Sequence, residues 1–307
     1  MRKYIESITK KIGFPNEATE FFLMLYDKLG ADELVRLEKL ESIYFMNDAV
    51  GRSENEINSL VCNKLSSFAS ERALDYRAVH MLFLIMCTKE LRLRYAEIGL
   101  SDEMYYDIVR DLRYKVIECK KYAGIWGSMN FSWFHRHFLV KLFAIGRFQY
   151  EEEVFRNESY DFGDVHLKKG DRVINIHIPS SGAITEDLRL ESYRRAYEFF
   201  KRDGNRYVVF VCNSWLIYPE NVHIYPENSN LAGFMGDFDI ISSDEHPVLP
   251  FPNAWRVFYK DYYGDTSKLP QNTSLEKNIV KWLENGGKIG DGYGVIVFDG
   301  ERIVNRK

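Results

Sequence analysis

The sequence predicts an α+β protein in which an all-α N-terminal domain precedes a mixed, mostly antiparallel β-sheet flanked by helices. One observation is that apolar residues recur at helical spacing through roughly the first 120 residues. A second is that short strand-like apolar runs replace this pattern after Gly124. A chain of 307 residues is also long enough for two domains. We therefore expect a helical domain over residues 1–122 and a second domain over residues 123–307.

The N-terminal half carries six predicted helices. The first runs through Tyr4, Ile5, Ile8 and Ile12 and ends at Gly13. The next three cover residues 21–29, 34–44 and 57–65, and the fifth and longest covers residues 70–98. Its centre, AVHMLFLIMC, is apolar on every side, which predicts burial by its neighbours. The sixth helix is expected after a capping serine at position 101 and continues to residue 116.

The C-terminal half alternates predicted strands and helices. A βαβ unit is expected from the strand Val173–Ile178, a helix over 188–201 and a strand over 207–217. A turn at Lys169-Gly170-Asp171 is expected to join the first of these strands to an earlier strand over 143–155, as an antiparallel pair. The remaining expected elements are helices over 231–235 and 274–285 and strands over 253–259 and 293–298.

Composition and charge exclude several classes of protein. The formal net charge of −4 argues against a general nucleic-acid or membrane-surface binder, because such proteins need a basic face. None of the four cysteines forms a C-x-x-C pair, so we expect reduced thiols and a cytoplasmic location. His135 and His137 lie two residues apart without a nearby third ligand, so we expect no metal.

The turn between the two strands of the βαβ unit is the first candidate binding site. It comprises Pro179–Thr185 and opens a helix, where backbone N–H groups commonly hold a phosphate or pyrophosphate. Gly182 permits a positive φ and the close approach of a ligand. Glu186 and Asp187, however, add negative charge near the same helix N-terminus. The residues alone therefore leave two interpretations, a phosphate-binding turn or a plain connection.

Candidate catalytic groups lie near the ends of the same strands. His177 immediately precedes the turn and is either a general base or a packed core histidine. Asn213 and Ser214 interrupt the second apolar strand, which marks either a place where two strands part or a ligand enters, or a bulge. Glu227 is expected at the same sheet end as Ser181, as a carboxylate base or a solvated loop acid. The run Glu151–Glu153 places acids on alternating strand faces, either solvated or directed at a substrate amine.

Several segments together resemble a known family. INIHIPSSG, CNSWLIYPE and PENSNLAGFMGDFDI, with WFHRHFLVKLFAIGRFQYE upstream, are similar to the two-domain acyltransferases. Those proteins join a helical N-acyltransferase N-terminal domain to a GNAT-like (Gcn5-related N-acetyltransferase-like) C-terminal domain. The resemblance covers nearly the whole chain and implies acyl-CoA or acetyl-CoA as co-substrate and a small-molecule amine as acceptor.

The resemblance also implies a set of site residues. In GNAT proteins a Q/R-x-x-G-x-G/A loop binds the pyrophosphate of acyl-CoA; here Ser180–Thr185 would be that loop, with Gly182 as its one glycine. Phe234 stands near the place where the family often has a tyrosine general acid. Glu227 or His177 would take the proton of the amine. The expected cofactor-binding residues are Ile178, Ser180, Ser181, Gly182, Ala183, Ile184, Thr185, Asn213, Ser214 and Asn230.

Two functions follow from these expectations. The first is an acyl-CoA-dependent N-acyltransferase that moves an acyl group from the CoA thioester to an amine. The second is a GNAT-like ligand-binding or sensing module without catalysis, which the single loop glycine and Phe234 favour.

Overall fold

The computed structural model describes residues 1–46, 52–246 and 251–306. The chain divides into two compact units, a helical unit, Met1–Phe143, and a sheet unit, Ala144–Lys307. The division lies later in the chain than the expected boundary after residue 122 because the intervening residues pack into the helical unit. A Cβ at Gly127 would lie 2.7 Å from the Arg77 carbonyl, and the Phe131 and Tyr44 ring centroids are 5.4 Å apart.

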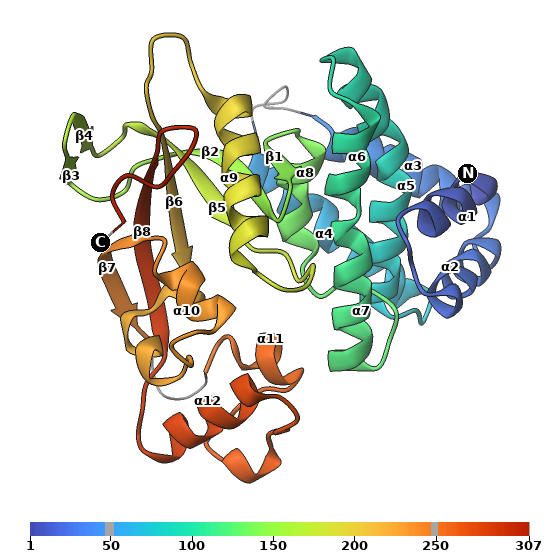
Figure 1. Cartoon of the computed structure of the whole chain (residues 1–307). Helices are drawn as coiled ribbons and strands as arrows, with labels where there is room; N and C mark the ends of the chain where they lie inside the picture. Colours follow the sequence, from blue (N-terminus) through green and yellow to red (C-terminus); the bar gives the residue numbers. More distant parts are fainter. Residues whose placement is uncertain (47–51, 247–250, 307) are drawn as a thin grey trace. The chain divides into compact units, whose positions relative to one another are not determined.

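The helical unit is built around one central helix. Its elements are α1 (Arg2–Lys11), α2 (Asn16–Asp27), α3 (Ala31–Tyr44), α4 (Glu54–Glu71), α5 (Tyr76–Glu97), α6 (Asp102–Val109), α7 (Asp111–Ala123), the 3-10 helix η1 (Phe131–Phe134) and α8 (His135–Phe138) (Figure 1). Every residue of α5 from position 78 to position 88 is buried, as the all-round apolar pattern predicts. Within the described residues, no helix combines the length and apolar character needed to cross a membrane.

Two predicted helices of this unit have different bounds. Helix α5 begins at Tyr76 rather than near residue 70, because the Asp75 carboxylate accepts a hydrogen bond from the Arg77 N–H (2.9 Å) and caps it. The predicted sixth helix is two helices, α6 and α7, which meet at Arg110. The predicted Ser101 cap is present, with its hydroxyl accepting from the Met104 N–H at 3.2 Å.

Glu41 on α3 gives the helical unit a pH-dependent stability. Burial, followed by the charges of Glu90 and Glu38, raises the pKa of Glu41 to about 7. The folded state therefore favours the neutral acid, and its stability falls as the pH rises from the unfolded-state pKa through the folded-state pKa. We expect Glu41→Gln to raise the free energy of unfolding by about 1–2 kcal/mol at pH 8, after allowance for solvent screening, and by much less at pH 5.

Urea denaturation at both pH values measures this effect, with Glu20→Gln on an exposed position of α2 as the control. A stabilisation of equal size at pH 5 and pH 8 would contradict the assignment to the Glu41 charge.

The sheet unit contains one large sheet and one hairpin. The strands are β1 (Leu142–Ile145), β2 (Phe148–Val154), β5 (Arg172–His177), β6 (Val208–Ser214), β8 (Gly290–Phe298) and β7 (Asp239–Glu245), in the spatial order β1-β2-β5-β6-β8-β7. Strands β5 and β6 are parallel, whereas β2–β5, β6–β8 and β7–β8 are antiparallel. The hairpin pairs β3 (Ser159–Phe162) with β4 (Val165–Lys168). This mixed, mostly antiparallel sheet confirms the predicted α+β class.

The helices of this unit pack either on the sheet or in a separate apolar cluster. They are α9 (Glu186–Phe200), α10 (Asn230–Met235), α11 (Ala254–Phe258), α12 (Ser274–Glu284) and the 3-10 helices η2 (Trp215–Ile217), η3 (Pro219–His223) and η4 (Thr266–Lys268) (Figure 1). Helix α9 connects the parallel strands β5 and β6, so the predicted βαβ unit is present.

Three expectations about strands are wrong. The predicted strand over 143–155 is two strands, β1 and β2, separated by a turn at Gly146, whose φ is +65°. The turn at 169–171 does not join β2 directly to β5, because the hairpin β3–β4 lies between them in the chain, but β2 and β5 do form the predicted antiparallel pair. The predicted strand over 253–259 is helix α11, in which Ala254 and Phe258 lie four residues apart on one buried face. A five-residue apolar run is too short for its spacing to distinguish helix from strand.

The large sheet has an apolar core on each face. On the α9 face, Tyr150 of β2, Tyr193 of α9 and Phe210 of β6 pack together, with ring centroids 5.6 and 5.9 Å from that of Phe210. On the opposite face, Val173 and Val211 pack with residues of the β3–β4 hairpin and β8. The central position predicted for Val173–Ile178 is therefore correct. Toward the end of β5 the second face becomes polar, and this end carries the candidate site.

Candidate functional site

Strands β5 and β6 separate where the candidate site begins. Their paired positions are Ile174 with Phe210 and Asn175 with Val211. Both strands continue beyond these pairs, β5 to His177 and β6 to Ser214. Beyond Asn175, the described backbone of β5 thus no longer pairs with β6. This geometry agrees with the interpretation that polar residues at the end of β6 mark the place where two strands part.

Arg147, in the turn between β1 and β2, holds the Pro179–Thr185 loop. Its Nε donates to the Ala183 carbonyl (2.9 Å), and its Nη2 donates to the Gly182 carbonyl (2.8 Å). Its Nη1 donates to the Pro179 carbonyl (3.0 Å) and to the Ser181 hydroxyl (2.8 Å). Sequence reasoning missed this residue because it lies more than 30 positions before the loop and belongs to no local motif.

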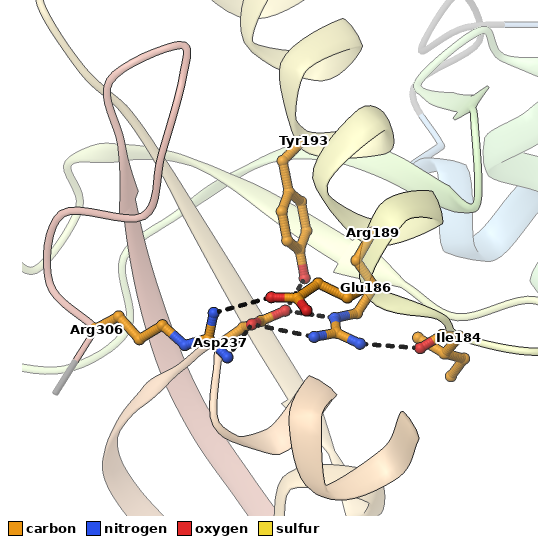
Figure 2. A network of polar contacts seen from close by, with 6 residues as sticks. All are labelled: Ile184, Glu186, Arg189, Tyr193, Asp237 and Arg306. Atoms are coloured by element: carbon orange, nitrogen blue, oxygen red, sulfur yellow. Dashed lines mark hydrogen bonds and ion pairs between the residues drawn. The ribbon is translucent and has the colours of Figure 1, made fainter. Parts of the chain in front are cut away.

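A second arginine fixes the other end of the loop. Arg189 of α9 donates from Nη1 to the Ile184 carbonyl (3.0 Å) and forms an ion pair with Asp237, with Nε and Oδ2 2.6 Å apart. Figure 2 shows this network, in which the Tyr193 hydroxyl also donates to Asp237 (3.2 Å). The Arg189 and Asp237 side chains are only 2% and 1% exposed. Burial raises the pKa of Asp237, and the neighbouring Arg189 opposes that shift.

Both acids that follow the loop interact with neighbouring groups. Arg306, near the C-terminal end of the described chain, lies 3.5 Å from Glu186 and 3.7 Å from Asp237 (Figure 2). Hydrogen bonds from the Thr185 side chain and from backbone N–H groups hold the pKa of Asp187 below its usual value. The negative charge expected at this helix N-terminus is thus partly compensated at Glu186 by an arginine that is remote in sequence.

The loop presents an open surface at its glycine. Gly182 has a φ of +111°, and a Cβ there would meet nothing within 4 Å. Glycine is therefore required by the backbone conformation rather than by crowding. Within the described parts of the chain, the N–H groups of Ala183, Ile184 and Thr185 have no backbone acceptor.

His177 is part of a half-buried polar network. Its Nε2 lies 3.1 Å from Glu151 Oε2, and their side chains are 16% and 12% exposed. Asn175 Nδ2 lies 3.3 Å from the same Nε2 but donates to Glu153 Oε1 at 3.0 Å. An Nε2–H that donates to Glu151 satisfies this arrangement, because the carboxylate can only accept. In that tautomer Nδ1 is the basic nitrogen of the neutral ring.

The same network has the composition of a metal ligand set. His177, Glu151 and Glu153 each offer one ligand atom within 4.8 Å of the others. Glu153 already accepts hydrogen bonds from Arg156 (2.6 Å) and from Asn175 (3.0 Å). Both carboxylate oxygens of Glu153 thus already accept a side-chain hydrogen bond, and we interpret the network as an imidazole oriented by Glu151.

Comparisons with known families agree with this architecture. The model of the GNAT-like C-terminal domain matches residues 142–296, about half of the chain. The model of the N-acyltransferase N-terminal domain matches residues 3–140. This chain belongs to the two-domain GNAT-like acyltransferase family. The predicted family is therefore confirmed.

Solved structures of acyltransferases share this fold. A crystal structure of an acyltransferase in complex with decanoyl-CoA aligns with a TM-score of 0.67 at 20% identity, over 94% of this chain and 86% of that one. An acyltransferase in complex with decanoyl-CoA and teicoplanin aligns with a TM-score of 0.61 at 19% identity, over 95% and 99% of the two chains. Among curated proteins, none matches the sequence.

The other predicted site residues of this GNAT-like acyltransferase lie in several surroundings. Ile178 directly follows β5, and Asn213 is exposed on β6. The Ser214 hydroxyl accepts from the Leu216 N–H (3.2 Å) and caps η2. Glu227 is exposed in the turn before α10, and Asn230 is the first residue of that helix. Among the described residues, no hydrogen bond or ion pair joins Glu227 to His177 or to the loop.

Phe234, which the family resemblance puts near a frequent tyrosine of GNAT enzymes, is a core residue. It is fully buried on α10 and packs against Phe148 and Phe238, with centroid distances of 5.4 and 5.1 Å. Tyr225 donates its hydroxyl to the Leu216 carbonyl (3.3 Å), and burial raises its pKa. Neither ring therefore offers a readily available proton donor.

Proposed function

We propose that this protein is an acyl-CoA-dependent N-acyltransferase that transfers an acyl group from a CoA thioester to the amine of a small molecule. The observation that carries the proposal is the arginine-held Pro179–Thr185 loop, which follows the His177–Glu151 pair at the place where β5 and β6 part. The family membership and the fold shared with acyltransferases in complex with decanoyl-CoA support it. A structurally similar acyltransferase in complex with teicoplanin supports a small-molecule acceptor.

The proposed donor site uses the loop and the start of α9. Backbone N–H groups at a helix N-terminus attract the negative charge of a pyrophosphate. Ser180–Thr185 would bind the pyrophosphate, and Ile178, directly after β5, would contact the pantetheine near the thioester. Asn213, Ser214 and Asn230 remain proposed contacts from β6 and α10.

His177 is the proposed base. The amine nitrogen attacks the thioester carbonyl, so that a C–N bond forms and, after the tetrahedral intermediate, the C–S bond breaks. Nδ1 of His177 accepts the proton that leaves the amine, directly or through one water. Backbone N–H groups near His177–Ile178 would stabilise the oxyanion, and the thiolate of CoA takes up a proton after release. Glu227 is the alternative base if the acceptor binds beside the exposed turn before α10.

Binding and turnover test the proposal directly. We expect calorimetry to detect binding of acetyl-, octanoyl- or decanoyl-CoA and an amine panel to release free CoA thiol. Native mass spectrometry of the purified protein should also find co-purified CoA species. Absence of binding to every acyl-CoA by both methods would refute the function.

One observation favours the second candidate, a binding or sensing module. Phe234, near the place where GNAT enzymes often use a tyrosine, has no proton to donate and is fully buried in the core. If CoA species are retained but no amine in the panel is acylated, the module is the better description.

We further propose a cytoplasmic location, because all four cysteines are free thiols in the structure and three of them are buried. Cell fractionation that places the protein in an oxidising compartment would contradict this location.

A further inference from the structure

We propose that Arg147 is a positioning residue that shapes the pyrophosphate-binding loop, in place of the glycines that GNAT loops use. This inference rests on the proposed function, because it assumes that the loop binds the pyrophosphate of acyl-CoA. It assigns a role to a residue outside the family's loop pattern, in the turn that joins β1 to β2.

Arginine side chains bind the carbonyl groups of the loop. The guanidinium group of Arg147 binds the carbonyl oxygens of Pro179, Gly182 and Ala183. Arg189 binds the next carbonyl, that of Ile184. Three successive carbonyl groups, those of residues 182, 183 and 184, thus point toward arginine side chains.

Peptide geometry determines the direction of the loop N–H groups. In a planar trans peptide, the C=O of one residue and the N–H of the next point in opposite directions. The carbonyls of residues 182–184 point at the arginines, so the N–H groups of Ala183, Ile184 and Thr185 point away from them. Successive N–H groups on one side of a loop at a helix N-terminus form an anion-binding concavity.

Arg147 performs here the function that several glycines have in a glycine-rich loop. In a glycine-rich loop, the backbone reaches its anion-binding conformation because the glycines lack side-chain restraint. Here Gly182 is the one loop residue with a positive φ, and the fork of Arg147 holds the remaining peptides in place. A lysine at position 147 would carry the charge, but its single nitrogen cannot reach all four acceptors.

The decisive experiment compares two acyl donors. Decanoyl-CoA carries the pyrophosphate, whereas decanoyl-pantetheine has the same thioester without it. For Arg147→Lys and Arg147→Gln, we expect KM for decanoyl-CoA to rise about 10–100-fold, as expected for a group that orients a binding site. The kcat with decanoyl-CoA and the kcat/KM with decanoyl-pantetheine should stay within a few fold of the unchanged protein. Ser181→Ala, which removes one of the four acceptors, should raise KM for decanoyl-CoA by a smaller factor.

Controls separate the possible failures. Arg194→Gln removes a half-exposed positive charge from α9 without touching the loop and should leave both donors unaffected. The positioning role would be overturned if the Arg147 variants lost the same factor in kcat/KM with decanoyl-CoA and with decanoyl-pantetheine. It would also be overturned if Arg147→Lys had the same KM for decanoyl-CoA as the unchanged protein. Calorimetry with CoA gives a readout without turnover. No CoA binding by the unchanged protein would defeat the proposed function itself, whereas equal CoA affinity of the unchanged and Arg147→Lys proteins would defeat this inference alone.

Discussion

Replacement of His177 by alanine is expected to lower kcat for acyl transfer by about 10²–10⁴-fold, the usual contribution of a positioned general base. The affinity of this variant for acyl-CoA should change little, because the Pro179–Thr185 loop, not His177, binds the pyrophosphate. The loss of kcat is expected because Glu151 orients the imidazole ring of His177 as a base. Glu151 lies 3.1 Å from Nε2 and keeps the proton there, so that Nδ1 can accept one from the amine.

Two further variants test this assignment of the base. Glu151→Gln weakens the control of the tautomer without removing the ring, so we expect a smaller loss of kcat and a changed pH dependence of kcat/KM. Glu227→Gln should leave kcat and kcat/KM nearly unchanged. Steady-state kinetics across pH, with acyl-CoA saturating, provides the comparison. If Glu227→Gln abolishes turnover while His177→Ala retains it, Glu227 is the base and our assignment is wrong.

Removal of one partner of the Arg189–Asp237 ion pair is expected to lower the free energy of unfolding of the sheet unit by about 3–5 kcal/mol. Both side chains are almost fully buried, so Arg189→Met leaves a carboxylate in an apolar surrounding with fewer partners. The Tyr193 hydroxyl and Arg306, 3.2 and 3.7 Å from Asp237, can replace only part of the lost interaction. Gly233 also matters here, because a Cβ at that position would approach the Arg189 guanidinium to 3.2 Å.

Urea denaturation followed by tryptophan fluorescence measures this loss, with Arg194→Gln on the same helix as the matched control. The double variant Arg189→Met/Asp237→Leu removes both charges and should recover part of the stability, because no unpaired charge is left buried. A loss below about 1 kcal/mol for Arg189→Met, the range of an exposed pair, would show that the burial of this pair contributes little.

The elements predicted with most success are those with a long or locally marked pattern. The all-round apolar centre of α5 and the β5–α9–β6 unit follow from apolar runs of six or more residues whose length and flanking turn residues indicate the element. Several short elements escaped prediction. The β3 and β4 strands have four residues each, and α11 has five, so tertiary packing rather than periodicity determines their conformation.

The candidate site shows the same division. His177 and the Pro179–Thr185 loop were found because polar residues and a glycine interrupt an apolar strand at a strand-to-helix turn. Arg147, Glu151 and Arg306 gained their roles only in the folded chain. Glu151 was noted as an acid on a strand face, but its pairing with His177 depends on the β2–β5 register, in which Glu151 lies opposite Asn175.

By itself, the sequence determined the family, the α+β class and the position of the loop, because these depend on local spacing and on contiguous motifs. The tertiary structure alone decided how the loop is held. Its carbonyls bind Arg147 from the preceding turn and Arg189 from the following helix, and its first acid pairs with Arg306. Hydrogen bonds and ion pairs depend on distances between atoms, and folding brings together residues that are more than 100 positions apart in the chain. The pattern of a sequence does not contain those distances.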